Sequence, residues 1–182
     1  MTTERPTRSE ILASKGRRLR DVIGPGLKVL FCGINPGLYS AAVGHHFARP
    51  GNRFWAALHS AGFTERTLAA SEDRHLLELG YGLTNIVARA TAGAPELHTE
   101  ELIAGRRRLE QKVRRYTPLW IAILGIGAYR IAFGKPLAVW GPQADRAGTS
   151  GLWVLPNPSG LNAGYQPAEL ARAFRRLRRA AS

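Results

Sequence analysis

The sequence predicts an α/β fold: a three-layer α/β/α sandwich around a central, mainly parallel sheet of about four strands. Short apolar runs at 27–32, 119–124 and 152–155, with a weaker one at 82–84, are typical of buried strands. Segments with helical character separate these runs. Strands that alternate with helices indicate a parallel sheet, because two parallel strands must be joined by a long crossover.

Helices are predicted between the strands. The first covers 11–23 and ends at Gly24-Pro-Gly26, after a polar lead over 1–10 that we expect to be disordered. An amphipathic helix follows at 52–61, and another over 71–79 begins at a capping serine. These two helices fill the connection between the strands at 27–32 and 82–84.

The second half of the chain adds further helices. The helix over 99–116 begins with two glutamates and ends with cations, as the helix dipole favours. Gly125 and Gly127 allow the start of a helix to pack closely against the strand before it, and proline opens the final basic helix, 167–180. We expect a single domain over 1–182, because this length and a hydrophobic content of 45% are enough for one core.

The charge of the chain indicates a polyanionic partner. There are 26 Lys and Arg residues against 13 Asp and Glu, which gives a formal net charge of +13. Arginines gather in clusters, the densest of them along the final helix. Such clusters suit phosphates, although they cannot select a base sequence. The alternative is a cationic surface produced by an Arg- and Ala-rich composition, so the final helix is either a phosphate grip or a solvated face.

Cysteine content and hydropathy argue against several classes of protein. Cys32 is the only cysteine, so an intrachain disulfide and a Cys-rich metal or iron–sulfur site are excluded. We expect no metal and no cofactor. The first residues carry no apolar core of a signal peptide, and no run approaches the length of a membrane span. A monomer in the cytoplasm, without membrane contact, is the expectation, associated with the nucleoid if the source is bacterial.

Two loops carry the most information on function. Gly33-Ile-Asn-Pro-Gly-Leu38 follows the first strand directly, and Leu155-Pro-Asn-Pro-Ser-Gly-Leu161 follows the last. Glycine and proline end the first strand abruptly, so Asn35 should lie exposed at the strand's C-terminal end, where open α/β sheets place their chemistry. An Asn carbonyl can orient a water molecule by hydrogen bonding, although an amide is not a useful general base.

Two other motifs invite a different chemistry. His45 and His46 suggest a metal site, but adjacent side chains point apart and no third ligand stands at an obvious spacing. Leu124-Gly-Ile-Gly-Ala-Tyr-Arg130 resembles the start of a dinucleotide-binding fingerprint. It lacks the third glycine, and no acidic residue ends a following strand at the required place.

Taken with Gly44-His-His-Phe-Ala48, Pro50-Gly-Asn-Arg-Phe-Trp55 and Gly82-Leu-Thr-Asn-Ile-Val87, the two loops resemble the mismatch-specific uracil-DNA glycosylase and thymine-DNA glycosylase family. The match is ordered and extends from about Gly26 to Arg178. The resemblance implies the same sandwich fold and a monofunctional enzyme of base excision repair. Such an enzyme flips uracil out of duplex DNA, preferentially from G·U mismatches, and hydrolyses the glycosidic bond to leave an abasic site.

The resemblance also implies roles for individual residues. Asn35 is the catalytic residue that positions water. The base pocket comprises Ile34, Gly37, the small Ser40, His46, Phe47 as stacking wall, and Asn85 at the edge of the base. Backbone amides around Ile34 and Phe47 receive the carbonyls of the base. Leu161 is the wedge that enters the base stack, with the remaining wedge and phosphate contacts from Asn157, Ser159, Gly160 and Asn162.

Two departures from the family pattern concern the second loop. Classical uracil glycosylases have a histidine at the position of Asn157, so we expect weaker activation of the leaving base. Some relatives carry a basic residue at the position of Ala163. The sequence leaves open the roles of His45 and His46 and the tolerance of thymine, hypoxanthine, etheno-adducts and single-stranded uracil. A DNA-binding module that recognises a lesion without cutting is the alternative to an enzyme.

Overall fold

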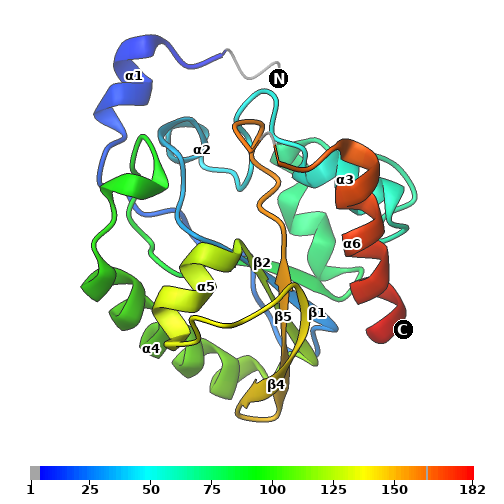
Figure 1. Ribbon diagram of the computed structural model, residues 1–182. Helices are drawn as coiled ribbons and strands as arrows, with labels where there is room; N and C mark the ends of the chain where they lie inside the picture. The colour runs from blue at the N-terminus through cyan, green and yellow to red at the C-terminus, as the bar shows by residue number, and fades with distance from the viewer. Residues whose placement is uncertain (1–4, 163) are drawn as a thin grey trace.

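The computed structural model describes residues 5–162 and 164–182 and has a central sheet flanked by helices on both faces (Figure 1). The sheet has five strands in the order β2-β1-β3-β5-β4. Four of them, β1, β2, β3 and β5, run parallel, and β4 pairs antiparallel with β5. The strands are β1 (Val29–Gly33), β2 (Tyr81–Asn85), β3 (Trp120–Leu124), β4 (Gly141–Ala147) and β5 (Ser150–Leu155). The predicted fold class is confirmed, with one strand more than expected.

The helices form the two outer layers. The described helices are α1 (Arg8–Ala13), α2 (Leu38–Val43), α3 (Phe54–Ser60), the 3₁₀ segments η1 (Ala70–Leu77) and η2 (Ala94–Glu96), α4 (Thr99–Tyr116), α5 (Ile126–Phe133) and α6 (Pro167–Ala180). Helices α3 and α6 pack together on one side of the sheet, and α4 packs with α5 on the other (Figure 1). Within the described residues, no helix is both long and apolar enough to cross a membrane.

Strand β1 shows how the sequence builds both cores. All five of its residues are buried, and their side chains alternate between the two faces of the sheet. Phe31 enters the core beneath α3 and α6, where it stacks on Phe174 with ring centroids 6.0 Å apart. Leu30 and Cys32 enter the opposite core with Tyr129. A continuous apolar run therefore marks a strand that is covered on both sides.

The register brings the ends of the parallel strands together. Gly33, the last residue of β1, pairs with Asn85, the last residue of β2, and Leu124 of β3 pairs with Leu155 of β5. The loops that follow these four residues consequently leave the sheet at the same edge. This edge is where both informative loops of the sequence meet.

The predicted helix over 11–23 is wrong. A capping box of Thr7 and Glu10 starts α1 three residues earlier, and the helix ends at Ala13. After it, Gly16 adopts φ +80° and the chain becomes extended, with bridges from Arg18 to Arg89 and from Val22 to Leu83. This extended segment covers the free edge of β2 and buries its own apolar side chains there, which a helix could not do. Residues 5–10 are thus described as ordered, whereas the rest of the predicted disordered lead, 1–4, lies outside the described residues.

Strand β4 and helix α2 were not predicted. The β4 sequence is polar and contains Pro142, because β4 lies at an edge of the sheet and only its two ends are buried. The tight connection to β5 uses Gly148 at φ +61°. Helix α2 has only six residues, too few for a periodic signal. The segment predicted as a helix over 71–79 is a kinked 3₁₀ segment instead.

Candidate active site

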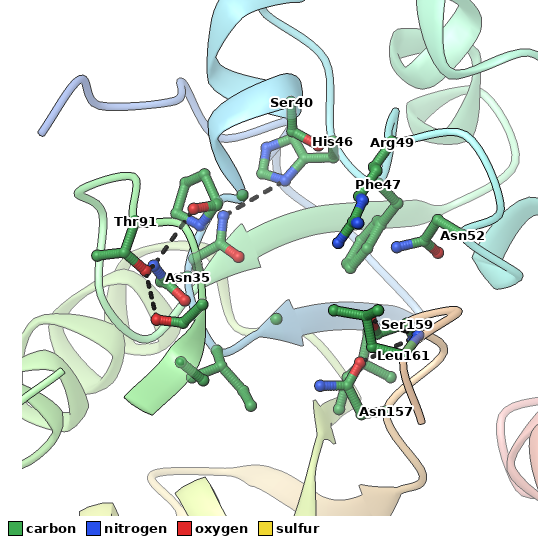
Figure 2. Close-up of a pocket in the computed structure, with 18 of the residues that line it drawn as sticks. Asn35, Ser40, His46, Phe47, Arg49, Asn52, Thr91, Asn157, Ser159 and Leu161 are labelled. Carbon is green, nitrogen blue, oxygen red and sulfur yellow. Dashed lines mark hydrogen bonds between the residues drawn. The ribbon is translucent and has the colours of Figure 1, made fainter. Parts of the chain in front are cut away.

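A cavity of about 380 Å³ lies at the carboxyl ends of the parallel strands (Figure 2). Its walls come from the loop after β1, the end of β2 with the segment after it, and the loop after β5. All the predicted site residues except Gly160 line the cavity: Ile34, Asn35, Gly37, Ser40, His46, Phe47, Asn85, Asn157, Ser159, Leu161 and Asn162. The structure thus brings together residues from motifs more than one hundred positions apart.

The amide of Asn35 is held in one orientation. Its Nδ2 donates to Thr91 Oγ1 at 2.7 Å and to the carbonyls of Arg89 and Pro36, both at 3.2 Å. Backbone carbonyls can only accept, so the nitrogen must face them. Oδ1 receives no hydrogen bond from any residue that the structure describes. The carbonyl oxygen of Asn35 is therefore the acceptor left for a ligand or a water molecule.

Thr91 and Arg89 hold the Asn35 side chain in place, a role that the sequence did not reveal. Thr91 donates its own hydroxyl to the Gly93 carbonyl at 2.8 Å, so its oxygen accepts from Asn35. Arg89 binds Glu101 of α4 with both guanidinium arms, at 2.6 and 2.8 Å. This ion pair holds the pKa of Glu101 at about 2, well below its usual range. Asn35 is thus anchored through a loop that is itself fixed to a helix.

Phe47 forms an aromatic wall on the side of the cavity opposite Asn35 (Figure 2). Its ring stacks on Phe54 with centroids 4.1 Å apart and planes 24° apart. Its backbone has φ +53°, a conformation that L residues seldom adopt and that the surrounding loop must enforce. Gly33 makes room for this arrangement, because a Cβ there would lie 2.5 Å from Asn85 Oδ1 and 3.4 Å from Phe47 Cζ.

His46 and Asn85 form a buried pair beside that wall. His46 is 1% exposed and its Nε2 lies 2.9 Å from the carbonyl of Arg20, so Nε2 carries the proton. Its Nδ1 is then the acceptor for the Asn85 amide nitrogen at 3.5 Å. This places the Asn85 carbonyl oxygen above Gly33, at the floor of the cavity. The carbonyl that fixes the histidine comes from the extended segment that sequence analysis had interpreted as a helix.

Burial lowers the pKa of His46, against the opposing effects of its hydrogen bond to Arg20 and of nearby carboxylates. The folded protein therefore keeps this imidazole neutral, whereas the unfolded chain binds a proton below about pH 6.5. The contribution of His46 to stability is full above that pH and falls as the pH drops, by up to about 1.4 kcal/mol per pH unit.

We therefore expect His46→Gln to lose less stability than the wild type between pH 7.5 and pH 5.5. Urea unfolding at the two pH values measures this difference, with the exposed His98→Gln as control. An equal loss in wild type and His46→Gln would contradict the assignment of a buried neutral imidazole.

His45 points to a different place. Its Nδ1 lies 3.1 Å from Asp73, which also accepts from the His46 backbone amide at 3.4 Å. His45 does not line the cavity. Ser40 accepts a hydrogen bond from the Ala48 amide at 3.1 Å and so ties the histidine loop to α2. The imidazole of His45 thus binds Asp73, whereas that of His46 binds the Arg20 carbonyl, so the two rings have different partners.

The loop after β5 is a compact turn braced by its own side chains. Asn157 Oδ1 accepts from the Ser159 amide at 3.0 Å, and Asn162 Nδ2 donates to the Asn157 carbonyl at 3.0 Å. The apolar side chain at its tip, Leu161, is 73% exposed. In soluble proteins an isolated exposed leucine is ordinary, but this one stands on a braced turn at the rim of a cavity. Ala163 lies outside the described residues.

Arg53 connects this loop to the rest of the site, and sequence analysis assigned it no role. Its guanidinium donates to the carbonyls of Tyr165, Ser159 and Asn162 at 2.5, 2.9 and 2.8 Å. Its backbone amide donates to the Pro158 carbonyl at 3.0 Å. Gly160 does not line the cavity because it packs on the chain before Arg53: a Cβ there would lie 2.5 Å from the Gly51 carbonyl oxygen. We call residues 157–162, held in this way, the Arg53-clamped loop.

Two more residues of the site were missed. Arg49 lines the cavity beside Phe47, and its guanidinium makes no hydrogen bond or ion pair with any part of the chain that the structure describes (Figure 2). Asn52 also lines the cavity, and its Oδ1 accepts from the Phe54 amide at 2.9 Å at the start of α3. Both stand in or next to a quoted motif, so their place was available to sequence analysis even though their roles were not.

Comparison with known proteins decides the family. The family model of the Uracil DNA glycosylase superfamily matches residues 20–178. The chain belongs to this superfamily. A solution NMR structure of a Methanosarcina acetivorans protein, provisionally described as a uracil DNA glycosylase, is similar in fold. It is 19% identical in sequence, the match covers 90% of this chain and 98% of that chain, and the TM-score is 0.55.

Membership of the uracil DNA glycosylase superfamily makes this protein a DNA glycosylase, a hydrolase of DNA repair whose partner is DNA that contains uracil. The matched range includes both loops of the cavity and the clamping arginine. The likeness to the archaeal structure concerns the fold, since so low an identity does not carry residue roles.

Proposed function

We propose that this glycosylase belongs to the mismatch-specific branch and removes uracil preferentially from G·U mismatches in duplex DNA. The observation that carries the proposal is the orientation of Asn35, whose free carbonyl oxygen faces a cavity with an aromatic wall on its other side. Water adds at the anomeric carbon of the sugar, the glycosidic bond breaks, and the bonding electrons leave with the base. The water loses one proton to the solvent, and the uracil anion takes up one proton from it. The products are free uracil and an abasic site.

The cavity fits a base that has been turned out of the helix. Phe47 would replace the stacking that the base loses, with its other face held by Phe54. The Asn85 carbonyl oxygen can accept from the N–H of uracil, and the remaining amide proton of Asn85 can be donated to a uracil carbonyl. The backbone amides of Ile34 and Phe47 donate to no described residue, so they are available to the carbonyls of the base.

Asn35 would act by holding water and not by taking its proton. An amide carbonyl orients a water molecule but cannot serve as a useful base, so the reaction is expected to be slow. Asn157 Oδ1 is already engaged by Ser159, which leaves the Asn157 amide nitrogen as a neutral donor for the departing base. Arg49 is free to approach a phosphate or the charge that develops on the base.

The Arg53-clamped loop would keep the base out of the helix. Extrusion costs a few kcal/mol and is least costly at a mismatch, and a side chain that fills the gap opposes the return of the base. Leu161 is exposed at the tip of a turn whose Ser159 and Asn162 carbonyls are held by the Arg53 guanidinium. Its partner across the gap would be the guanine of the G·U pair.

The proposal also covers the mode of action. Within the described residues no lysine lines the cavity, which supports hydrolysis without a Schiff base and therefore without strand cleavage. We propose a monomer that acts as one domain on DNA in the cytoplasm, because base repair of this kind needs no second copy of the site.

Single-turnover release of uracil from labelled duplexes tests the proposal. A strand of about 30 nucleotides carries one uracil, which is placed opposite guanine, opposite adenine or in single-stranded DNA. Alkali then reveals the abasic sites. We expect release from G·U at least about 10-fold faster than from A·U, the ratio that a difference of about 1.4 kcal/mol in extrusion cost produces. Strand breaks should appear only after alkali. Equal rates for G·U and A·U would contradict mismatch preference, and tight binding without release would favour the lesion-binding alternative.

A further inference from the structure

A second groove lies behind the Arg53-clamped loop, between α6 and the β4–β5 edge of the sheet. Its volume is about 340 Å³, similar to that of the base cavity. Aromatic and charged side chains dominate its lining: Trp140, Trp153, Tyr165, Glu169, Arg172 and Arg176. We call it the Trp140 groove. Nothing in the proposed excision reaction uses it.

The aromatic side of the groove has the form of a stacking platform. Trp140 is 38% exposed, although it is the largest kind of apolar side chain. Tyr165 braces it edge-on, with ring centroids 5.5 Å apart and planes 78° apart. Trp153, which is buried, closes the base of the groove and is itself braced by Trp120. An indole held in place at the surface offers a flat apolar face at little cost in conformational entropy.

The charged side of the groove favours an anion. Arg172 and Arg176 are one helical turn apart on α6 and therefore share a face of the helix. Neither guanidinium makes a hydrogen bond or an ion pair with any described residue. Glu169 also lines the groove, but its carboxylate is engaged by the Gln166 amide at 2.8 Å at the start of α6. Two unengaged guanidinium groups beside an aromatic platform match the pattern of single-strand binding sites.

The groove is continuous with the proposed DNA interface. Tyr165 lies three residues beyond Asn162, and Arg53 binds the carbonyls of both. The clamp that holds the wedge thus also positions one wall of the Trp140 groove. We propose that the groove binds an unpaired nucleotide of single-stranded DNA, with its base against Trp140 and its phosphates at Arg172 and Arg176. This inference rests on the proposed function only in taking DNA as the polymer.

Binding of uracil-free probes tests the inference. The probes are a fluorescein-labelled octamer of deoxyadenosine and an octamer of abasic deoxyribose phosphate, both of which lack a base for excision. Trp140→Ala is expected to weaken binding of the deoxyadenosine octamer about 10-fold and to leave the abasic octamer unchanged, since one stacked base contributes about 1–3 kcal/mol. Trp140→Phe keeps a ring and should retain most of the affinity.

The arginines are tested by salt dependence. Arg172→Gln with Arg176→Gln should lower the slope of log affinity against log salt by about 1.4, because each phosphate contact on a single strand contributes about 0.7. The matched control is Arg107→Gln with Arg108→Gln on α4, which changes the net charge equally on the other side of the sheet. An equal effect of both pairs, or an unchanged affinity of Trp140→Ala, would overturn the proposal. So would equally tight binding of an acidic octapeptide that competes with the DNA.

The proposed function and this groove fail separately. Asn35→Ala should bind the deoxyadenosine octamer as the wild type does, and Trp140→Ala should still release uracil. If the wild type releases no uracil but Trp140→Ala still weakens binding of the octamer, the result supports the nucleotide-binding groove and contradicts the excision proposal.

Discussion

Replacing Asn35 with alanine is expected to lower the single-turnover rate of uracil release by about 10²–10³-fold, within the range that loss of one positioned proton-transfer or water-binding group produces. Binding of the uracil duplex should change by less than about threefold, because a small side chain facing a cavity contributes little to the contact area. The measurement is alkali-revealed cleavage under enzyme excess, with binding followed by fluorescence anisotropy on the same duplex.

Thr91→Val is the matched variant for this result. It removes one of the three acceptors that hold the Asn35 amide and leaves the carbonyl in place. We expect an intermediate loss of rate, about 10-fold, with unchanged binding, because only the two longer hydrogen bonds to backbone carbonyls then hold the amide. Full activity of Asn35→Ala would exclude Asn35 as the water-positioning residue. Loss of binding together with rate would assign Asn35 to recognition and not to chemistry.

The position of Asn35 could be predicted from the sequence because its signals are local. A continuous apolar run marks β1 as a buried strand, and glycine with proline ends it. Residues directly after a parallel strand must lie at its carboxyl edge whatever the rest of the chain does. The same argument located Asn85 and Asn157, which follow or end parallel strands.

The partners of these residues could not be predicted, since they depend on contacts that are distant in sequence. Thr91 is 56 positions from Asn35, and the three carbonyls that Arg53 binds are 106 to 112 positions from it. Local propensity does not report such pairs. The resemblance supplied the residues that we expect to contact DNA, whereas the side chains that hold them in place became visible only in the fold.

The error over 11–23 has the same origin. Leu12, Leu19 and Ile23 share a side of a helix on the sequence pattern alone. In the structure Leu19 and Val22 are buried because the free edge of β2 accepts an extended segment there. An edge strand that needs a backbone partner can override helical periodicity. The consequence reaches the active site, since the Arg20 carbonyl on this segment fixes the tautomer of His46.

Replacing Arg53 with methionine is expected to slow uracil release from duplex DNA far more than from single-stranded DNA. The change removes three donors at once and leaves the carbonyls of Ser159, Asn162 and Tyr165 without them. Hydrogen bonds to a charged group contribute about 1.5–3 kcal/mol each where they are partly buried, so a loss of about 2–4 kcal/mol in unfolding free energy is expected, some of it offset by water. The loop that carries Leu161 would then no longer hold one conformation.

The selectivity of the loss distinguishes a positioning role from general destabilisation. A wedge is needed only where a base must be kept out of a helix, so single-stranded uracil does not depend on it. We expect Arg53→Met to slow release from the G·U duplex at least about 30-fold, equivalent to about 2 kcal/mol of activation free energy, and from single-stranded uracil less than about threefold. Arg53→Lys, which offers one point charge in place of a planar fork, should lie between the wild type and Arg53→Met.

Leu161→Ala completes this comparison, because it removes the wedge itself while Arg53 keeps its three carbonyls. Leu161→Ala should slow uracil release from the duplex far more than from the single strand, as Arg53→Met does. It should not lower the free energy of unfolding measured in urea. If Arg53→Met slows both substrates equally, the arginine acts through the stability of the whole fold, and the clamp is not what positions the wedge. If Arg53→Met is selective and Leu161→Ala is not, the clamped backbone holds the DNA open by itself, and the exposed leucine is an ordinary surface side chain.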